Sequence, residues 1–192
     1  MKIPPDDVFS RLLRTRLARA GTSFFFSKPT PAQSSNPYNP DLEEVGFQFE
    51  KFVLRRFNDN YFTLLEWRSA KQLDGRFPKS CQLPDFEFYF QTEYESFHFA
   101  VECKWRANFQ FGSVSWAKDS QLRRYKEYQD ETKIPVFIVL GVGGESNKPN
   151  VVYCFRPDEV DNSTLHEITL APFRRRNPGD NFFINPAANK LT

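Results

Sequence analysis

Residues 83–90 read Leu-Pro-Asp-Phe-Glu-Phe-Tyr-Phe and residues 97–106 read Phe-His-Phe-Ala-Val-Glu-Cys-Lys-Trp-Arg, and these two stretches decide the fold. In both, large apolar residues alternate with other residues, which is the period of a strand with two different faces. Only residues 91–96 separate the stretches, so the pattern predicts a β-hairpin. Its apolar face is built mostly from aromatic rings, namely Phe86, Phe88, Phe90, Phe97, Phe99 and Trp105.

Further elements surround this hairpin on both sides in the sequence. Apolar residues recur at helical spacing in 45–57, and 116–131 has a second helical pattern. Strands are expected at 61–67, at the continuous apolar run 135–141 and at 151–155, where 135–141 is typical of a central strand covered on both faces. The order of these elements predicts an α/β fold with a mixed central β-sheet flanked by helices.

Composition narrows the class of protein. The chain has 192 residues, 40% of them hydrophobic, and 22 are Phe, so one domain with a substantial core is expected. No apolar run approaches the roughly 20 residues of a membrane span, which predicts a protein without membrane helices. Three widely spaced cysteines make a poor disulfide framework, and no secretory signal pattern opens the chain, so a reducing, cytoplasmic location is expected.

Charge and proline content divide the chain into three parts. Residues 1–40 hold six basic and two acidic residues and end in a Pro/Ser-rich stretch, which is typical of a basic arm and linker. The remaining 152 residues hold 20 basic and 22 acidic residues, so the formal net charge of +2 gives no overall case for nucleic-acid binding. We expect a core domain at 41–172 and a polar C-terminal tail at 173–192.

The polar faces of the predicted hairpin carry a candidate metal site. Glu102 and Lys104 lie two residues apart and share a face, and a pairing that brings Asp85 beside Glu102 would add a second carboxylate. With the backbone carbonyl of Cys103, these oxygens suit Mg²⁺ or Mn²⁺, and Lys104 would position an attacking water. Glu-x-Lys on a strand is usually only a solvated surface pair. Here it lies among Phe and Trp, where unpaired charge is unfavourable.

These residues resemble a known family. Pro84-Asp85, followed by Glu102-Cys103-Lys104, is similar to the motif of the PD-(D/E)xK nuclease superfamily, and 101–105 resembles the strand of Mrr-like restriction endonucleases. Gln121 and Tyr125 resemble the Q-x-x-x-Y helix of the RecB-like branch. The resemblance spans residues 41–155 and implies a restriction-endonuclease-like core with a metal-dependent deoxyribonuclease activity.

The resemblance also implies roles for single residues. Asp85, Glu102 and the Cys103 carbonyl would bind the metal, Glu50 would help to arrange it, and Lys104 would position the water. Gln121 would orient the metal–phosphate site, with Tyr125 as support. Two further carboxylates are possible substitutes for Asp85, namely Glu87 and, more weakly, Asp74.

DNA is the expected partner, either alone or with a second copy of the chain or a recognition subunit. Local positive charge should hold its backbone, and the candidates in the core are Lys118, Arg106, Arg123 and Arg124, with the Arg174–Arg176 run as a further option. Two alternatives stay open at this stage. One is a catalytically inactive module with the nuclease fold, which binds DNA or protein. The other is an unrelated α/β protein whose surface charges imitate the motif.

Overall fold

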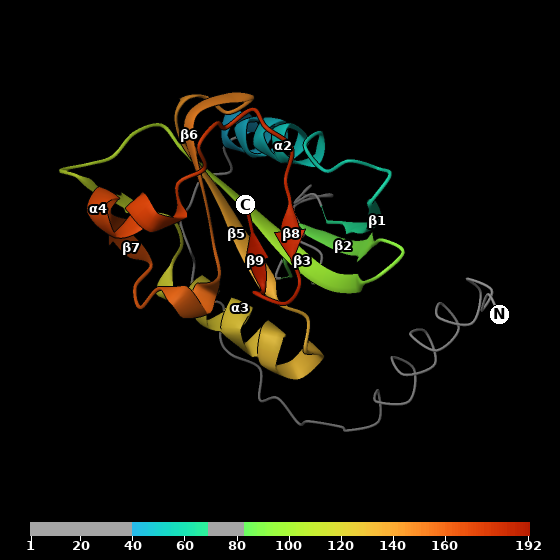
Figure 1. Ribbon diagram of the computed structural model, residues 1–192. Coiled ribbons are helices and arrows are strands. Elements are labelled where there is room, and N and C mark those ends of the chain that lie inside the picture. Colours follow the sequence, from blue (N-terminus) through green and yellow to red (C-terminus); the bar gives the residue numbers. More distant parts are fainter. Residues whose placement is uncertain (1–39, 69–82) are drawn as a thin grey trace. The chain divides into compact units, whose positions relative to one another are not determined.

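The computed structural model describes residues 40–68 and 83–192. The expected basic arm and Asp74 lie outside these residues. In the described part, five strands form one sheet in the order β1-β2-β3-β5-β6, and α2 and α3 lie on opposite sides of it (Figure 1). The predicted α/β class, with a mixed sheet flanked by helices, is confirmed.

The strands of the main sheet follow the predicted ranges closely. They are β1 (Phe62–Trp67), β2 (Phe86–Gln91), β3 (Ser96–Arg106), β5 (Val136–Glu145) and β6 (Lys148–Phe155). β3 and β5 are parallel, whereas all other neighbours are antiparallel. β5 and β6 extend beyond the expected ranges because the glycine-containing turn between them continues the ladder to Glu145 and Lys148.

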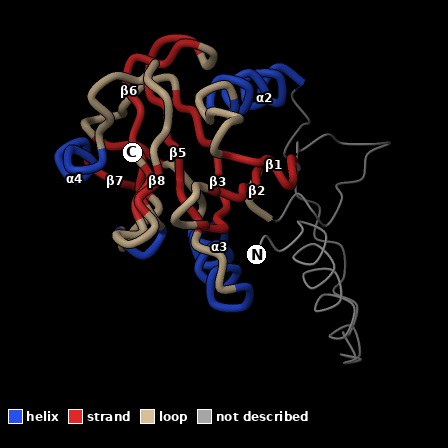
Figure 2. Tube along the Cα trace, turned by 45° about the vertical axis from the view of Figure 1, so that its right-hand side comes forward, coloured by secondary structure: helices blue, strands red, loops and turns tan. Residues whose placement is uncertain are grey.

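The helices and smaller strands complete the fold, as the tube view shows (Figure 2). The two long helices are α2 (Pro40–Leu54) and α3 (Asp119–Thr132), and α4 is short (Glu167–Leu170). Two short two-stranded sheets pair β4 (Ser113–Ser115) with β7 (Thr164–His166) and β8 (Ile184–Asn185) with β9 (Lys190–Leu191). Among the described residues, no helix is both long and apolar enough to cross a bilayer.

Each face of the sheet has its own apolar core. On the α2 side, the odd-numbered rings of β3 and the even-numbered rings of β2 pack against Phe49 and Phe52. On the α3 side, Ala100 and the even-numbered buried residues of β5 pack against Tyr125 and Tyr128. The alternation in the sequence thus predicts correctly which residues share a face. On the polar faces of the hairpin, Glu87 and Glu102 are buried, at 3% and 4% exposed.

The C-terminal segment differs from its expected role as a tail. Phe182 is 1% exposed, and Ile184 and Leu191 are also buried in the core on the α2 side. Backbone hydrogen bonds join the amide of Phe182 to the carbonyl of Arg56 and the amide of Arg175 to that of Val152. Residues 173–192 are therefore part of the folded unit.

Candidate functional site

The register of the β2–β3 hairpin brings Asp85 to Glu102. Phe86 pairs with Val101, and the next antiparallel position beyond the ladder sets Asp85 opposite Glu102. The half-buried Asp85 uses its Oδ2 to accept a hydrogen bond of 2.7 Å from the amide of Cys103. The Asp85 side chain therefore continues the ladder in place of a backbone carbonyl, and this fixes it beside Glu102.

The backbone of Cys103 faces the same side as Asp85. The amide of Ala100 donates to Pro135, toward β5, and successive residues of a strand direct their backbone groups to opposite sides. The amide and carbonyl of Cys103 therefore both face the β2 side of β3. β2 begins only at Phe86, so this carbonyl lies where the hairpin ladder has ended.

Glu102 lies under α3 and is 4% exposed. Its Oε1 accepts hydrogen bonds from Lys104 Nζ and from the hydroxyl of Tyr125, the latter at 2.7 Å. Lys104 and Tyr125 therefore hold the carboxylate from the strand and from the helix. Oε2 of Glu102 has no hydrogen bond to a described residue.

Glu50 reaches the same group of charges from α2. The helix lies close to the sheet because Gly141 of β5 leaves room for the ring of Phe49, which would approach a Cβ at that position to 2.5 Å. Glu50 is 8% exposed, and its Oε2 accepts a hydrogen bond of 2.7 Å from Trp67 Nε1. The helix and β1 thus fix a third carboxylate near Asp85 and Glu102.

The charges of this cluster act on one another. Burial, and then the negative charge of Glu102, raise the pKa of Asp85 well above its usual value. Burial and the charge of Glu102 also raise the pKa of Glu50, against the hydrogen bond from Trp67. Burial disfavours the ammonium of Lys104, but Glu102 and Asp85 outweigh it and raise its pKa. Three carboxylates thus share one ammonium, and the cluster has an excess of negative charge.

A divalent cation fits the chemistry of this cluster. Asp85, Glu102 and Glu50 each direct one oxygen to a protein donor and keep a second oxygen without a hydrogen bond to a described residue. Within residues 40–68 and 83–192, no three His, Cys, Asp or Glu side chains are gathered closely enough to hold a metal ion by themselves. Mg²⁺ commonly takes only one or two carboxylates, completed by carbonyls and waters. The oxygens that could hold such an ion are those of Asp85, Glu102 and the carbonyl of Cys103, and the charge of Glu50 acts on both carboxylates.

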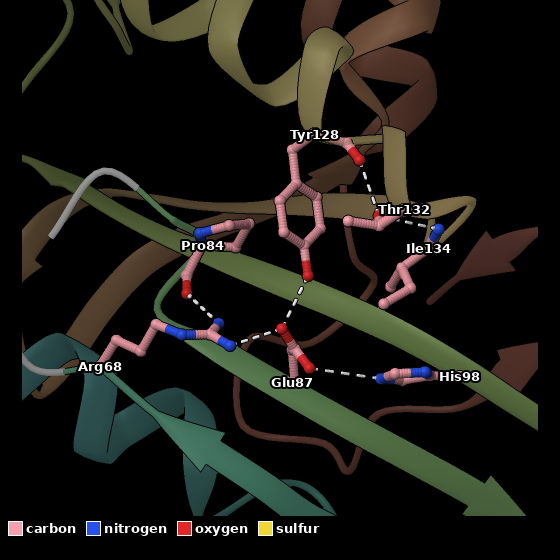
Figure 3. Close-up of polar contacts among 7 residues, drawn as sticks. All are labelled: Arg68, Pro84, Glu87, His98, Tyr128, Thr132 and Ile134. Carbon is pink, nitrogen blue, oxygen red and sulfur yellow. Dashed lines mark hydrogen bonds and ion pairs between the residues drawn. The ribbon is translucent and has the colours of Figure 1, made fainter. Parts of the chain in front are cut away.

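Glu87 belongs to a separate buried network and does not substitute for Asp85 (Figure 3). Its Oε1 accepts hydrogen bonds from Arg68 Nη2 at 2.5 Å and from the Tyr128 hydroxyl at 2.7 Å, and its Oε2 lies 3.5 Å from His98 Nε2. Burial alone would raise the pKa of Glu87, but the polar contacts from His98, Tyr128 and Arg68 lower it to about 2. Its Oε1 is thus held by two donors, and its Oε2 lies beside the His98 ring.

Arg68 links this network to Asp85. Its Nη1 donates to the carbonyl of Pro84 at 3.0 Å, and its backbone amide donates to the carbonyl of Asp85 at 2.7 Å. The Glu87 carboxylate holds the guanidinium in this position. Arg68 therefore fixes the backbone on which the Asp85 carboxylate is mounted.

Two of the predicted site residues have other uses in the structure. Gln121 Oε1 accepts the amide hydrogen of Lys118 at 3.0 Å and so caps the start of α3. Arg106 donates to the backbone carbonyls of Ser115, Trp116 and Trp105, and burial lowers its pKa. Arg106 thus stabilises the loop after β3 by binding its backbone carbonyls. The remaining predicted DNA contacts lie along the first turns of α3, where Lys118 and Arg123 are exposed and Arg124 is half-buried.

Some residues of the site were not found from the sequence. Trp67 and Arg68 lie at the end of β1, far from the motif, and no pattern in the sequence links them to Glu50 or Asp85. Tyr125 was expected only as support, yet it donates directly to Glu102. The spacing of the helix gave a signal in this case, because Tyr125 and Tyr128 share the buried face of α3.

The chain was compared with protein families, curated proteins and solved structures. No protein-family model matches the chain, and no curated protein matches it. Among solved structures, the chain is similar to Hjc, a Holliday junction resolvase from the archaeal hyperthermophile Archaeoglobus fulgidus. The two are 12% identical with a TM-score of 0.47, over 67% of this chain and 93% of that one.

Proposed function

We propose that the chain is a metal-dependent nuclease that hydrolyses phosphodiester bonds in DNA. The observation that carries this proposal is the meeting of Asp85, Glu102 and Lys104 at the open end of the hairpin, with an excess of buried negative charge. These residue types suit metal-assisted phosphodiester hydrolysis. Their order, Pro-Asp followed by Glu-x-Lys, is the one that resembles the PD-(D/E)xK superfamily.

The residues of the site divide the work of holding the metal and positioning the water. Asp85, Glu102 and the Cys103 carbonyl hold Mg²⁺ or Mn²⁺, which when bound supplies positive charge to the phosphate. Lys104 positions the attacking water and stabilises the negative charge that develops on the phosphate oxygens. Glu50 supports the metal site through the charge it adds and through its bond to Trp67. Tyr125 positions Glu102.

The DNA partner is held by positive charge near the start of α3. Lys118 and Arg123 are exposed and free to meet backbone phosphates, and Arg124 lies beside them. Cutting of both strands would need a second copy of the chain or a partner subunit. Gln121 caps the helix start that carries Lys118.

A cleavage panel tests the proposal. The purified full chain is incubated with linear, circular, single-stranded and branched DNA in Mg²⁺, in Mn²⁺ and in EDTA. We expect cleavage in either metal and none in EDTA. Asp85→Asn and Lys104→Met should each reduce the rate by at least about 100-fold, because the first removes a carboxylate that holds the metal and the second removes the ammonium that positions the water.

The matched controls remove equivalent charges at exposed positions. Glu95→Gln lies in the hairpin turn and Lys148→Met at the start of β6, and both should retain the wild-type rate. Cleavage that survives in Asp85→Asn or Lys104→Met would exclude this site as its source. DNA binding without cleavage in any metal would instead support the inactive, DNA-binding alternative.

A further inference from the structure

A second charged region lies around the C-terminal segment and is lined by cations. One hollow of about 260 Å³ is lined by Arg174, Arg175, Arg176 and Lys190, and a second of about 330 Å³ is lined by Arg55 and Arg56. Asn181 lines both hollows, so they are neighbours. Among the residues that the structure describes, Asp180 is the only acidic one that lines either hollow. We call the six basic residues the basic tract.

Arg175 forms the buried part of this tract. It is 8% exposed, and its Nη2 donates to the carbonyls of Asp180 and Asn181, each at 2.9 Å. Its guanidinium carbon lies 4.0 Å from the centre of the Phe182 ring. Nη1 is buried without a hydrogen-bond partner, and no described carboxylate forms an ion pair with Arg175. A buried cation without an anion is unfavourable, and burial lowers its pKa.

Arg56 brings a second guanidinium that has no anionic partner among the described residues. Its donors go to backbone carbonyls, with Nε 3.2 Å from Pro178 O and Nη1 2.5 Å from Phe52 O. Burial and then the charge of Arg175 lower its pKa, so the two guanidiniums are close enough to repel each other. Like Arg175, it forms no ion pair with a described carboxylate. A bound anion would weaken the repulsion between the two guanidinium groups. It would also offset the free-energy cost of burying their charge.

The exposed members of the tract provide the contacts that an anion can reach. Arg174, Arg176, Lys190 and Arg55 are exposed around the two hollows. Guanidinium groups match the geometry of phosphate oxygens with paired donors. Cations spread over two adjoining hollows suit a chain of phosphates better than a single small anion.

We infer that the basic tract binds the phosphate backbone of a nucleic acid, at a place separate from the carboxylate cluster. The inference rests on the proposed nuclease function for the identity of the polyanion. It deepens that proposal because the carboxylate cluster, without a metal, repels phosphate. Affinity for DNA must then come from basic surfaces outside the cluster. The tract adds to the basic residues of α3 a concentration of positive charge that forms no ion pair with a described carboxylate.

Binding without cleavage tests the inference. The full chain carrying Asp85→Asn is titrated into fluorescein-labelled duplex DNA in EDTA, and anisotropy is measured from 50 to 300 mM NaCl. Adding Arg174→Gln and Arg176→Gln should weaken binding about tenfold at 0.1 M salt. The slope of log K against log salt should fall by about 1.8, which is the loss of two phosphate contacts. These two side chains are exposed, so folding should be unaffected.

The matched control removes two cations elsewhere. Lys133→Gln with Lys148→Gln, after the end of α3 and at the start of β6, causes the same loss of net charge and should change affinity less than twofold. Equal affinities of the tract variant and this control would overturn the inference. So would a result in which inorganic phosphate raises the melting temperature through Arg174 and Arg176 while DNA affinity is unchanged, because the tract would then be a free-phosphate site.

The two proposals fail in distinguishable ways. If the tract variant loses DNA affinity but the wild type never cleaves DNA in any metal, the nuclease proposal fails and the tract stands. If the wild type cleaves DNA while the tract variant binds as tightly as the control, the tract alone is refuted.

Discussion

The hydroxyl of Tyr125 donates a hydrogen bond of 2.7 Å to Oε1 of Glu102, and both residues are buried between α3 and the sheet. The same oxygen accepts the ammonium of Lys104. The tyrosine therefore determines which oxygen of Glu102 faces Lys104 and leaves the other for a ligand. α3 thus reaches the Glu102 carboxylate through this hydroxyl.

Removal of that hydroxyl should impair cleavage more than folding. Tyr125→Phe keeps the ring in the core but frees Glu102 to rotate, and we expect cleavage to fall about tenfold, as for other residues that orient metal ligands. The free energy of unfolding should fall by about 1–2 kcal/mol, because a buried acceptor loses one of two donors. Single-turnover cleavage and urea denaturation measure the two effects.

Tyr128→Phe is the matched control for this substitution. Its hydroxyl also donates at 2.7 Å to a buried carboxylate, but that carboxylate is Glu87. It should lose similar stability with a much smaller loss of cleavage. Equal losses of cleavage in the two variants would mean that Tyr125 acts only through the stability of α3.

The sequence was informative where periodicity alone determines position. Alternation in the hairpin is sufficient to separate the two faces of β2 and β3. Once the strands pair, the short turn between Gln91 and Ser96 fixes the register, and the register sets Asp85 opposite Glu102. The central position of β5 follows from its continuous apolar run in the same way.

Residues whose roles depend on the path of a loop could not be placed from the sequence. Arg106 follows Lys104 on the same face, yet its donors go to carbonyls that a loop brings back from Ser115 and Trp116. Gln121 matches a motif, yet it caps the helix because the amide of Lys118 would otherwise be unpaired. The C-terminal segment looks polar on average, but a few apolar side chains such as Phe182 are enough to fix it to the core.

Neutralising Asp85 should stabilise the protein in the absence of metal. Burial and the charge of Glu102 raise the pKa of Asp85, so its ionised form destabilises the folded state near neutral pH. Asp85→Asn keeps an oxygen for the Cys103 amide and should raise the free energy of unfolding by about 1 kcal/mol in EDTA. Thermal denaturation at pH 7.5 measures this.

Bound metal should make the wild type more stable than Asp85→Asn. At 100 times its dissociation constant, Mg²⁺ should stabilise the wild type by about 2.7 kcal/mol, whereas Asp85→Asn should gain little. Glu95→Gln, an exposed carboxylate in the hairpin turn, should respond to Mg²⁺ as the wild type does. A wild-type melting temperature that is independent of Mg²⁺ and Mn²⁺ would refute the metal site.

The Glu87 network should make the protein sensitive to acid. The pKa of Glu87 falls from 4.5 to about 2 on folding, so the unfolded chain binds more protons between these values. Its stabilisation is complete above about pH 4.5 and is lost as the pH falls toward 2. The shift corresponds to about 3 kcal/mol.

Glu87→Gln isolates this contribution. At pH 7 it should destabilise the protein by about 3 kcal/mol, because it leaves the buried guanidinium of Arg68 without its carboxylate. The difference from the wild type should shrink between pH 5 and pH 3 in urea denaturation in EDTA. A difference that stays constant over this range would show that the ion pair does not cause it.

The close approach of α2 to the sheet should depend on Gly141. A Cβ there would lie 2.5 Å from Cε2 and 2.8 Å from Cζ of the buried Phe49, so Gly141→Ala must move this ring, which neighbours Glu50 on α2. We expect a loss of about 2 kcal/mol in unfolding free energy and reduced cleavage, although Gly141 has no role in the chemistry.

Adding Phe49→Leu to Gly141→Ala should restore part of the stability and part of the cleavage, giving a non-additive double-mutant cycle. Gly46→Ala, in α2 with open space around it, should instead stabilise the protein by up to about 1 kcal/mol. Strictly additive effects of Gly141→Ala and Phe49→Leu would show that the ring contact does not set the position of α2.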